Sequence, residues 1–217
     1  TKPGSKPVPA NEESKRIVPI IKAIKNKYEN ILISVDTYKS SVAKKAIEAG
    51  ADFVNDISGL TFDNEMVFLL AQSDIPVVVM HINGKPKTMQ KNILYSDLIS
   101  DMKRFFIKQC DYAINSGIKE SNIIIDPGIG FGKTFDHNFT LLKRLKEFED
   151  LGFPILIGPS RKAFIGDVLN LPSNERVEGT IATIVAGILN GANIIRVHDV
   201  KEIKRAAIIT EEILKAK

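Results

Sequence analysis

The sequence predicts an α/β protein with a single domain over residues 1–217, a parallel (β/α)8 barrel that lacks its first two strands. Short apolar runs alternate six times with longer segments of helical periodicity, which is typical of parallel strands connected by helices. Polar residues stand at the C-terminal end of every apolar run, and the connections are short. An open doubly wound sheet is the alternative, but it would concentrate polar residues around one switch point.

The opening of the chain is the reason to expect missing strands. The sequence begins on the loop-like segment Thr-Lys-Pro-Gly-Ser-Lys-Pro, and a helix follows it instead of a strand. Six strands cannot close a ring that normally contains eight. We therefore expect a longer natural protein in which residues before Thr1 supply the first two strands.

The first half of the chain contains an opening helix and three strand–helix units. The predicted elements are helices at 11–28, 40–50, 64–72 and 96–115 and strands at 31–35, 53–54 and 77–80. The helices are predicted by apolar residues three and four positions apart, and the strands by β-branched runs. Pro19 predicts a kink in the first helix. Ser40 or Ser41 can cap the second helix, and Gly50 suits its end.

The second half of the chain contains three further strand–helix units. Its predicted strands lie at 123–125, 154–157 and 194–198. Its helices run from Asp136, which is expected to be the cap, to 151, over 173–190 and from Val200. Gly117, Gly152 and Gly191 follow helices, where a left-handed residue is often needed. A loop of about a dozen residues separates His81 from the helix at 96–115, and loops of that length are usually functional or mobile.

Composition excludes several classes of protein. The chain is 44% hydrophobic and 26% charged, and no apolar run reaches the roughly 20 residues of a membrane span. A single cysteine, Cys110, excludes an intramolecular disulfide, fits a reducing cytoplasmic compartment and is expected to be a small buried hydrophobe. The net charge of +4 fits an anionic small substrate, whereas no basic stretch interleaved with aromatic residues supports nucleic-acid binding.

Polar side chains mark the ends of all six predicted strands. In order they are Asp36, Asn55 with Asp56, His81, Asp126, Ser160-Arg161-Lys162, and Arg196 with His198. A barrel gathers such residues at the face where its chemistry takes place. Carboxylates and amides can bind the donor edge of an amino-pyrimidine ring, and Lys162, Arg196 and His198 can neutralise phosphate. A heterocyclic substrate with an anionic group would fit such a site.

Each of these residues also has a simpler interpretation. Asp36 could cap the helix that follows it, and Asn55-Asp56 could be turn residues. His81 is expected to be a loop or packing residue, and His137, at a helix start, is expected to be structural. Three histidines without metal-binding spacing do not indicate a zinc site. Arg196 needs a partner, whether Asp199, another carboxylate or a ligand, because an unpaired charge on an apolar strand is costly.

The segment from Ile123 to Lys133 combines a buried strand, a carboxylate and a glycine-rich turn. Pro127 cannot donate to a sheet ladder, so the strand ends there and leaves Asp126 at its tip. A Walker A motif would require glycine at Pro127, and a dinucleotide fingerprint would require glycine at Lys133, so neither nucleotide site is predicted. The turn is expected to be open and flexible. Phe131 could stack on a flat ligand or pack inward, and Lys133 has no predicted role.

Together these segments resemble the dihydropteroate synthase family over essentially the whole chain. The matching motifs are Thr1-Lys2-Pro3-Gly4, Ser34-Val35-Asp36-Thr37, Asn55-Asp56-Ile57, Met80-His81, Asp126 to Lys133, Gly158 to Lys162 and Arg196-Val197-His198-Asp199. The last three are quite specific in combination. The resemblance implies a transferase of folate biosynthesis that joins 6-hydroxymethyl-7,8-dihydropterin diphosphate to p-aminobenzoate and releases pyrophosphate.

The resemblance also implies roles for individual residues. The pterin would be bound by Asp36, Asn55, Met80, Asp126, Phe131, Gly158 and Lys162. The aminobenzoate would be bordered by Thr1, Pro3, Phe131, Ser160 and Lys162, and the diphosphate would be held by Lys2, Arg196 and His198. Catalysis would stabilise the departing diphosphate and the cationic pterin fragment. Lys2 stands where the family usually has arginine, which keeps the charge but loses the bidentate fork.

Further expectations follow from the same resemblance. It implies Mg²⁺ as a cofactor, a homodimer and a target of sulfonamides. No metal ligand is expected in this chain, because the family's asparagine that helps to bind Mg²⁺ and diphosphate belongs to the first strand. Two alternatives remain open. A methyltetrahydrofolate–corrinoid methyltransferase shares the Asp and Asn strand ends, although it would not be expected to contain 160–162 together with 196–198. A non-catalytic barrel could retain the pocket as a binding module.

Overall fold

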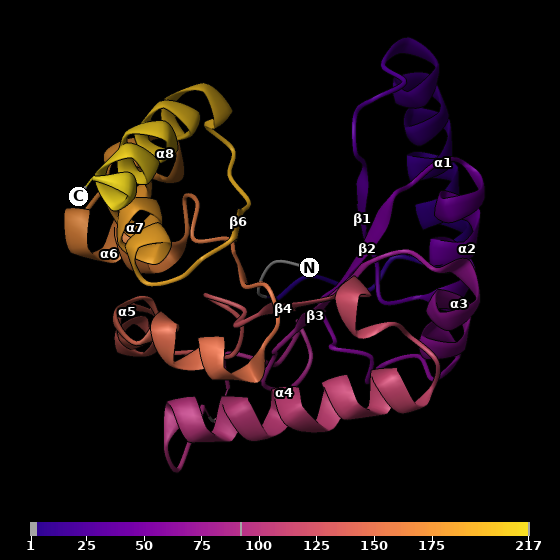
Figure 1. Cartoon of the computed structure of the whole chain (residues 1–217), viewed down its shortest axis with the longest axis horizontal. Coiled ribbons are helices and arrows are strands. Elements are labelled where there is room, and N and C mark those ends of the chain that lie inside the picture. Colours follow the sequence, from indigo (N-terminus) through magenta and orange to yellow (C-terminus); the bar gives the residue numbers. More distant parts are fainter. Residues whose placement is uncertain (1–3, 92, 217) are drawn as a thin grey trace.

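The computed structural model describes residues 4–91 and 93–216, which form helices around a set of parallel strands (Figure 1). The strands are β1 (Ser34–Asp36), β2 (Phe53–Asp56), β3 (Val77–Met80), β4 (Ile123–Asp126), β5 (Leu156–Ile157) and β6 (Ile194–Ile195). Strands β1 to β4 form one sheet, and β5 pairs with β6. A bridge between Ile125 and Ile155 connects the two sheets, and all of these pairings are parallel.

Strand order separates the two predicted architectures. The order of a doubly wound sheet reverses at a switch point, whereas the strands of a barrel follow one another around the ring. Here β1-β2-β3-β4 is followed by β5-β6, without a reversal among the described strands. The predicted parallel α/β architecture is confirmed, and the described strands follow the order of a barrel.

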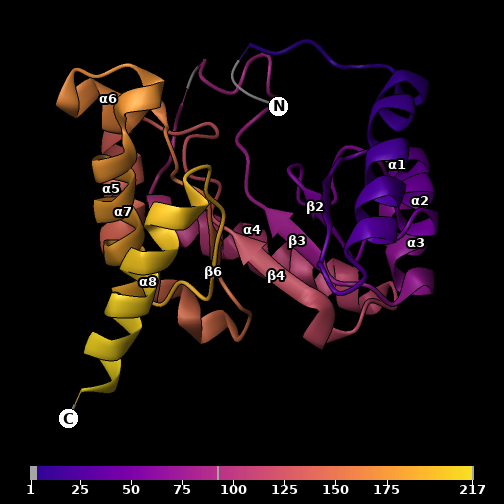
Figure 2. The same cartoon turned by 90° about the horizontal axis from the view of Figure 1, so that it is seen from above.

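Helices cover the outer side of the strands (Figures 1 and 2). They are α1 (Ala10–Lys27), α2 (Ser40–Glu48), α3 (Glu65–Ser73), α4 (Leu98–Asn115), α5 (Phe135–Lys143), α6 (Ala163–Leu169), α7 (Val177–Leu189) and α8 (Val200–Lys215), with 3-10 turns at Glu120–Asn122, Leu145–Leu151 and Ser173–Glu175. Each α-helix that packs on the strands does so through one apolar face; α2, for example, buries Val42, Ala43 and Ala46. None of the α-helices in 4–91 and 93–216 has the length and hydropathy that crossing a membrane would require.

The core lies between the strands and this helical layer. Every residue of β3 is buried, as expected for a strand covered on both faces. Helix α4 contributes Met102, Phe106 and Cys110, all at most 1% exposed. Burying an apolar side chain of this size stabilises the fold by about 1.5–3 kcal/mol. Burial also raises the pKa of the Cys110 thiol to about 12, so the prediction of a small buried hydrophobe is confirmed.

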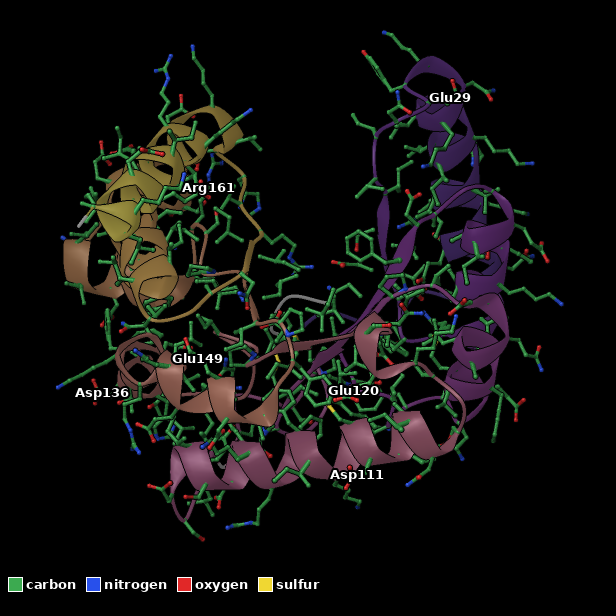
Figure 3. The ribbon with its side chains drawn as sticks, in the orientation of Figure 1. Glu29, Asp111, Glu120, Asp136, Glu149 and Arg161 are labelled. Carbon is green, nitrogen blue, oxygen red and sulfur yellow. The ribbon has the colours of Figure 1, made fainter. Side chains whose placement is uncertain are left out.

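The prediction that Asp136 caps a helix is wrong. Thr134 is the N-cap of α5, and its hydroxyl accepts the N–H of His137 at 3.1 Å. The His137 ring accepts the N–H of Thr134 at 3.3 Å in return, which completes a capping box. Asp136 is exposed at the outer end of α5 (Figure 3). The structural role predicted for His137 is therefore confirmed.

Other predicted boundaries also need correction. Neither Ser40 nor Ser41 caps α2, because the helix begins at Ser40 and Asp63 accepts the Ser40 N–H at 2.8 Å. The helix expected from 136 to 151 breaks into α5 and a 3-10 turn, and the strand expected at 194–198 is reduced to β6. Helix α6 was not predicted at all, since its seven residues are too few to show a clear period.

The first and last described strands, β1 and β6, lie on the two sides of a gap between the ribbons, which we call the opening (Figure 1). Strand β1 pairs with β2 alone and β6 with β5 alone within the described parts of the chain. Helix α8 beside β6 has exposed apolar side chains, namely Ile208, Ile209, Ile213 and Leu214. The C-terminal strand ends on the two sides of this opening carry the polar residues of the site.

Candidate active site

An ion pair joins the first described strand to the last. Asp36, at the end of β1, accepts hydrogen bonds from Arg196 Nη1 at 2.9 and 3.1 Å. Arg196 follows β6, so the pair spans the opening. The partner that Arg196 requires is therefore the Asp36 carboxylate, which also accepts a hydrogen bond from Asn55 Nδ2 at 2.6 Å. Both charged side chains are 40–48% exposed, so a ligand can reach them and compete for them.

Asn55, at the end of β2, presents an acceptor that nothing in the protein uses. Its side chain is 2% exposed and its Nδ2 is bound to Asp36, but its Oδ1 has no hydrogen-bond partner. It is the only such buried side-chain atom found within 4–91 and 93–216. An unsatisfied buried acceptor costs about 1–3 kcal/mol, so it is evidence for a donor supplied by a ligand.

The neighbouring Asp56 has a different role. Its carboxylate accepts hydrogen bonds from the N–H and hydroxyl of Ser58 at 2.8 and 2.7 Å and from the N–H of Leu60 at 3.0 Å. Burial raises the pKa of Asp56 to about 6, and these bonds oppose that shift. Asp56 is therefore a turn residue, as the simpler interpretation predicted, whereas Asn55 is oriented into the site by Asp36.

Asp126 is a buried carboxylate at the end of β4. It is 2% exposed, and its Oδ1 accepts the Gly128 N–H at 2.7 Å. Burial raises the pKa of Asp126, and the Gly128 N–H and nearby cationic side chains partly offset the increase. Gly128 has a φ of +65°, and a Cβ there would lie 2.1 Å from the His81 carbonyl oxygen. Only glycine therefore allows the chain to turn beside Asp126.

Side chains hold four successive carbonyl groups of the turn from Ile129 to Gly132. Lys162 Nζ donates to Ile129, Gln90 Nε2 to Gly130 at 2.9 Å, Lys133 Nζ to Phe131 at 3.0 Å, and the Tyr95 hydroxyl to Gly132 at 2.8 Å. Asn138 Oδ1 also accepts the Gly130 N–H at 2.6 Å. The expectation of an open, flexible turn is therefore wrong, because its backbone is fixed by groups from several parts of the chain.

Phe131 and Lys162 lie against each other at this turn. Lys162 Nζ is 4.4 Å from the centroid of the Phe131 ring, within the range of a cation–π contact. Phe131 is only 7% exposed and packs inward, in a small apolar cluster with Met80 and Met89 that is separate from the main core. Burial lowers the pKa of Lys162 to about 8, and the negative charge of Asp126 opposes that decrease.

The loop after β5 is tied to the segment after β6. Ser160 Oγ lies 2.9 Å from His198 Nδ1 and accepts the His198 N–H at 3.1 Å. Arg161, which has a φ of +57° and is labelled in Figure 3, forms an ion pair with Asp199 just before α8. Ser160 is buried whereas His198 is exposed. The segments after β5 and β6 therefore present a hydroxyl and an imidazole in direct contact.

The structure describes some of the remaining predicted site residues and not others. Met80 is fully buried in β3, and Gly158 is buried beside Arg196. Thr1, Lys2 and Pro3 lie outside the described residues. Within 4–91 and 93–216, no group of three or more His, Cys, Asp or Glu side chains is placed to hold a metal ion.

Sequence reasoning missed the side chains that support the site from behind. Gln90 and Tyr95 belong to the long loop after His81, and loop length was the only signal that could have drawn attention to them. Arg176 donates to the carbonyl groups of Arg161 and Lys162 at 3.0 and 3.2 Å, and no local pattern marks it.

Comparison with known proteins places these residues in a family. A family model described as pterin binding enzyme matches residues 1–198. The dihydropteroate synthase of Synechocystis is 50% identical over 202 residues, which cover 93% of this chain and 70% of that protein.

Solved structures agree with the sequence comparison. Yersinia pestis dihydropteroate synthase in complex with a sulfonamide drug superimposes with a TM-score of 0.96 at 39% identity, covering 99% of this chain and 78% of that one. The Clostridium difficile enzyme, determined in the presence of pteroic acid, gives a TM-score of 0.93 at 42% identity over 98% and 78% of the two chains. With its strand order, its strand-end residues and these relatives, the chain belongs to the dihydropteroate synthases, the pterin-binding transferases of folate biosynthesis.

Proposed function

We propose that the strand ends of this chain bind the two substrates of dihydropteroate synthase in three adjoining positions. The observation that carries the assignment is the unpaired Oδ1 of Asn55, which lies in a site that also contains the buried carboxylate of Asp126. A pterin presents amino and ring N–H donors along one edge. Two buried acceptors are the complement of that edge, because a buried acceptor without a donor is costly.

The pterin position is completed by groups around these two acceptors. Asp36 orients the Asn55 amide through the 2.6 Å bond, and Lys162 offers a cation near Asp126. Met80, Phe131 and Gly158 contribute the walls, since small or apolar groups allow a flat ring to approach closely. In this arrangement the heterocycle is recognised by polar atoms at its edge and by packing on its faces.

The arylamine position lies beside Phe131, Ser160 and Lys162, with Thr1 and Pro3 as its other border. The Clostridium difficile relative was determined with pteroic acid, in which a pterin and an aminobenzoate are joined. The Yersinia pestis relative binds a sulfonamide drug. We extend both observations to this chain, in which a sulfonamide would occupy the arylamine position and compete with p-aminobenzoate.

The diphosphate position is formed by Arg196 and His198, together with Lys2. During the reaction the bond between the pterin methylene carbon and the diphosphate oxygen breaks, and its electron pair leaves with the diphosphate. The arylamine nitrogen then forms the C–N bond and loses a proton. Cationic side chains stabilise the departing anion, and no nucleophilic side chain is required. Arg196 can exchange its contact with Asp36 for the diphosphate, because both groups are accessible.

Mg²⁺ is proposed as a cofactor that binds together with the diphosphate. The described residues do not supply a cluster of three ligands for it, so we assign no step of the reaction to the metal. Removal of Mg²⁺ with a chelator is expected to slow turnover. Titration with Mg²⁺ should show binding only when pterin diphosphate is present, and binding of equal strength without it would contradict this arrangement.

Three finer expectations complete the proposal. We propose that strands outside the described residues close the barrel between β6 and β1, which is supported by the single pairing of each of these strands. We also propose a homodimer and a cytoplasmic location. Turnover of a longer form is compared with turnover of the 217-residue form to test closure of the barrel, and sedimentation of both forms tests the homodimer. Unaided catalysis by the 217-residue chain at the full rate would contradict closure.

A condensation assay with pterin diphosphate and p-aminobenzoate tests the function. We expect dihydropteroate and pyrophosphate as products, no methyl transfer to a corrinoid, and a loss of more than about a thousandfold in turnover for Asp126→Ala and Lys162→Ala. Lys143→Ala, which changes an exposed lysine of α5, is the matched control. Activity close to wild type in either site variant would refute the assigned site, and methyl transfer would favour the methyltransferase alternative.

A further inference from the structure

We propose that Lys133 is a positioning residue for the reaction, which acts with His81 as a buried strut that fixes Phe131 in the wall of the pterin and arylamine positions. The inference rests on the proposed function. It assigns a role to the one polar residue of the glycine-rich turn that the substrate contacts proposed above leave unused.

The strut consists of two buried polar side chains in direct contact. Lys133 is 2% exposed and His81 is 7% exposed. Lys133 Nζ lies 3.0 Å from His81 Nδ1 and 3.0 Å from the Phe131 carbonyl oxygen. The His81 carbonyl oxygen lies 3.5 Å away. One amine therefore joins the segment after β3 to the backbone of the turn after β4.

The His81 end of the strut is held rigidly. The His81 N–H donates to the Asp126 carbonyl at 2.9 Å, which continues the pairing of β3 with β4. The imidazole packs edge-on against Phe105, with ring centroids 4.9 Å apart. The His81 backbone also lies close to Gly128, where no side chain would fit. In the tautomer that carries its proton on Nε2, His81 presents Nδ1 as a fixed acceptor, which determines where the lysine amine stands.

The Phe131 end of the strut faces the substrates. Lys133 holds the carbonyl of the residue whose ring lies 4.4 Å from Lys162 Nζ. Lys162 in turn donates to the preceding Ile129 carbonyl. A shift of Phe131 would therefore move both an apolar wall and a cation that the proposed site uses. Displacements of about 1 Å in such groups can reduce catalytic efficiency by about a hundredfold.

Packing alone does not account for an amine at this position. Methionine has a similar length and would fill the same volume without the cost of burying a polar group. The amine is useful only if its hydrogen bonds are needed, and its best-placed acceptors are His81 Nδ1 and the Phe131 carbonyl. This is the difference that an experiment can measure, since methionine preserves the packing and removes the bonds.

Steady-state kinetics on the intact enzyme test the proposal with two matched comparisons. Lys133→Met is compared with Lys143→Met, which changes an exposed lysine. His81→Asn is compared with His81→Leu, because an asparagine oxygen can replace Nδ1 as the acceptor whereas leucine cannot. Asp126→Ala is included as the variant that tests the proposed function itself.

We expect Lys133→Met and His81→Leu to raise the KM for pterin diphosphate by about tenfold, with kcat reduced less than about threefold, because neither side chain touches reacting atoms. His81→Asn is expected to remain within about threefold of wild type, since it keeps the acceptor. If Lys133→Met does not fold, the two His81 variants decide the question.

Two results would overturn the strut. In the first, Lys133→Met and His81→Leu have the same KM as Lys143→Met. If Asp126→Ala is inactive in that case, the proposed function still stands. The other is an equal loss in His81→Asn and His81→Leu, which would show that only the bulk of the ring matters. Full activity of Asp126→Ala would instead refute the proposed function on which the strut rests.

Discussion

The glycine-rich turn and the opening between β1 and β6 are built in opposite ways. At the turn, four successive carbonyl groups are each bound by a side chain, and Asp126 and Lys133 are buried beside them. At the opening, Asp36 and Arg196 are partly exposed and bind each other. The turn is fixed before any ligand arrives, whereas the charges at the opening are free to change partners.

This difference corresponds to what each region is proposed to bind. A pterin ring keeps its shape and charge pattern during binding, so a preformed set of buried acceptors suits it. The diphosphate enters, develops charge and leaves, so its cations must remain accessible and exchangeable. The comparison predicts that substitution of Arg196 at the opening affects recognition of the diphosphate selectively, while substitutions at the turn affect recognition of the pterin itself.

The largest effect that separates the two regions is expected for Arg196→Ala. Without the guanidinium we expect the affinity for pterin diphosphate to fall about a hundredfold, because charge-assisted bonds to phosphate are lost. Affinity for the pterin without diphosphate should change less than about threefold. Calorimetric titration with both ligands provides the measurement, and Asn55→Ala, expected to weaken both, is the matched variant. If Arg196→Ala lowers the affinity for both ligands equally, the distinction between the opening and the turn is contradicted.

A pH-dependent difference in stability is expected from the buried amine of the turn. Burial lowers the pKa of Lys133 to about 7, while its value in the unfolded chain is about 10.4. Between these values the unfolded chain binds a proton that the folded chain does not. Folding stability relative to Lys133→Met should therefore rise with pH, by at most about 1.4 kcal/mol per pH unit.

Denaturant unfolding of wild type and Lys133→Met from pH 6.5 to 9 measures this difference. The charged or titratable groups around the amine are His81, Asp126, Lys162 and the more distant Tyr95, and all are present in both proteins. If the difference in the free energy of unfolding stays constant over this pH range, burial does not lower the pKa of the Lys133 amine.

The smallest effect is expected for Tyr95→Phe, at the edge of the turn. The substitution removes the 2.8 Å hydrogen bond from the tyrosine hydroxyl to the Gly132 carbonyl. We expect the free energy of unfolding to fall by about 1 kcal/mol, the usual net value of one such bond. Tyr112→Phe, on the more exposed face of α4, is the matched control. If Tyr95→Phe lowers the free energy of unfolding no more than the control does, the turn keeps its conformation without this side-chain contact.

Much of the fold followed from local pattern. The run Val77 to Met80 is buried on both faces and became β3 with the predicted boundaries. Strand order did not follow from pattern alone, because pairing between distant segments leaves no mark in a single sequence. The short helix α6 was missed because seven residues show no clear period, and the cap at Thr134 was missed because it depends on hydrogen bonds that periodicity does not record.

The site was predictable where its residues stand at strand ends. Asp36, Asn55 and Arg196 were found from their positions, and the structure brings them together through two hydrogen-bonded contacts. The supporting residues Gln90 and Tyr95 could not be found, because their roles depend on how a long loop folds back on the turn. The buried state of Lys133 was equally hidden, since a lysine after a glycine-rich turn is usually solvated.

Binding of pterin to Asp126→Asn tests the central claim most directly. The asparagine oxygen can still accept the Gly128 N–H, so the turn should keep its shape, but the amide presents a donor where the pterin needs an acceptor. Calorimetric titration with a pterin lacking the diphosphate avoids any contribution from the cations at the opening. We expect a loss of affinity of at least about a hundredfold relative to wild type. Unchanged affinity would contradict the assignment of the pterin position.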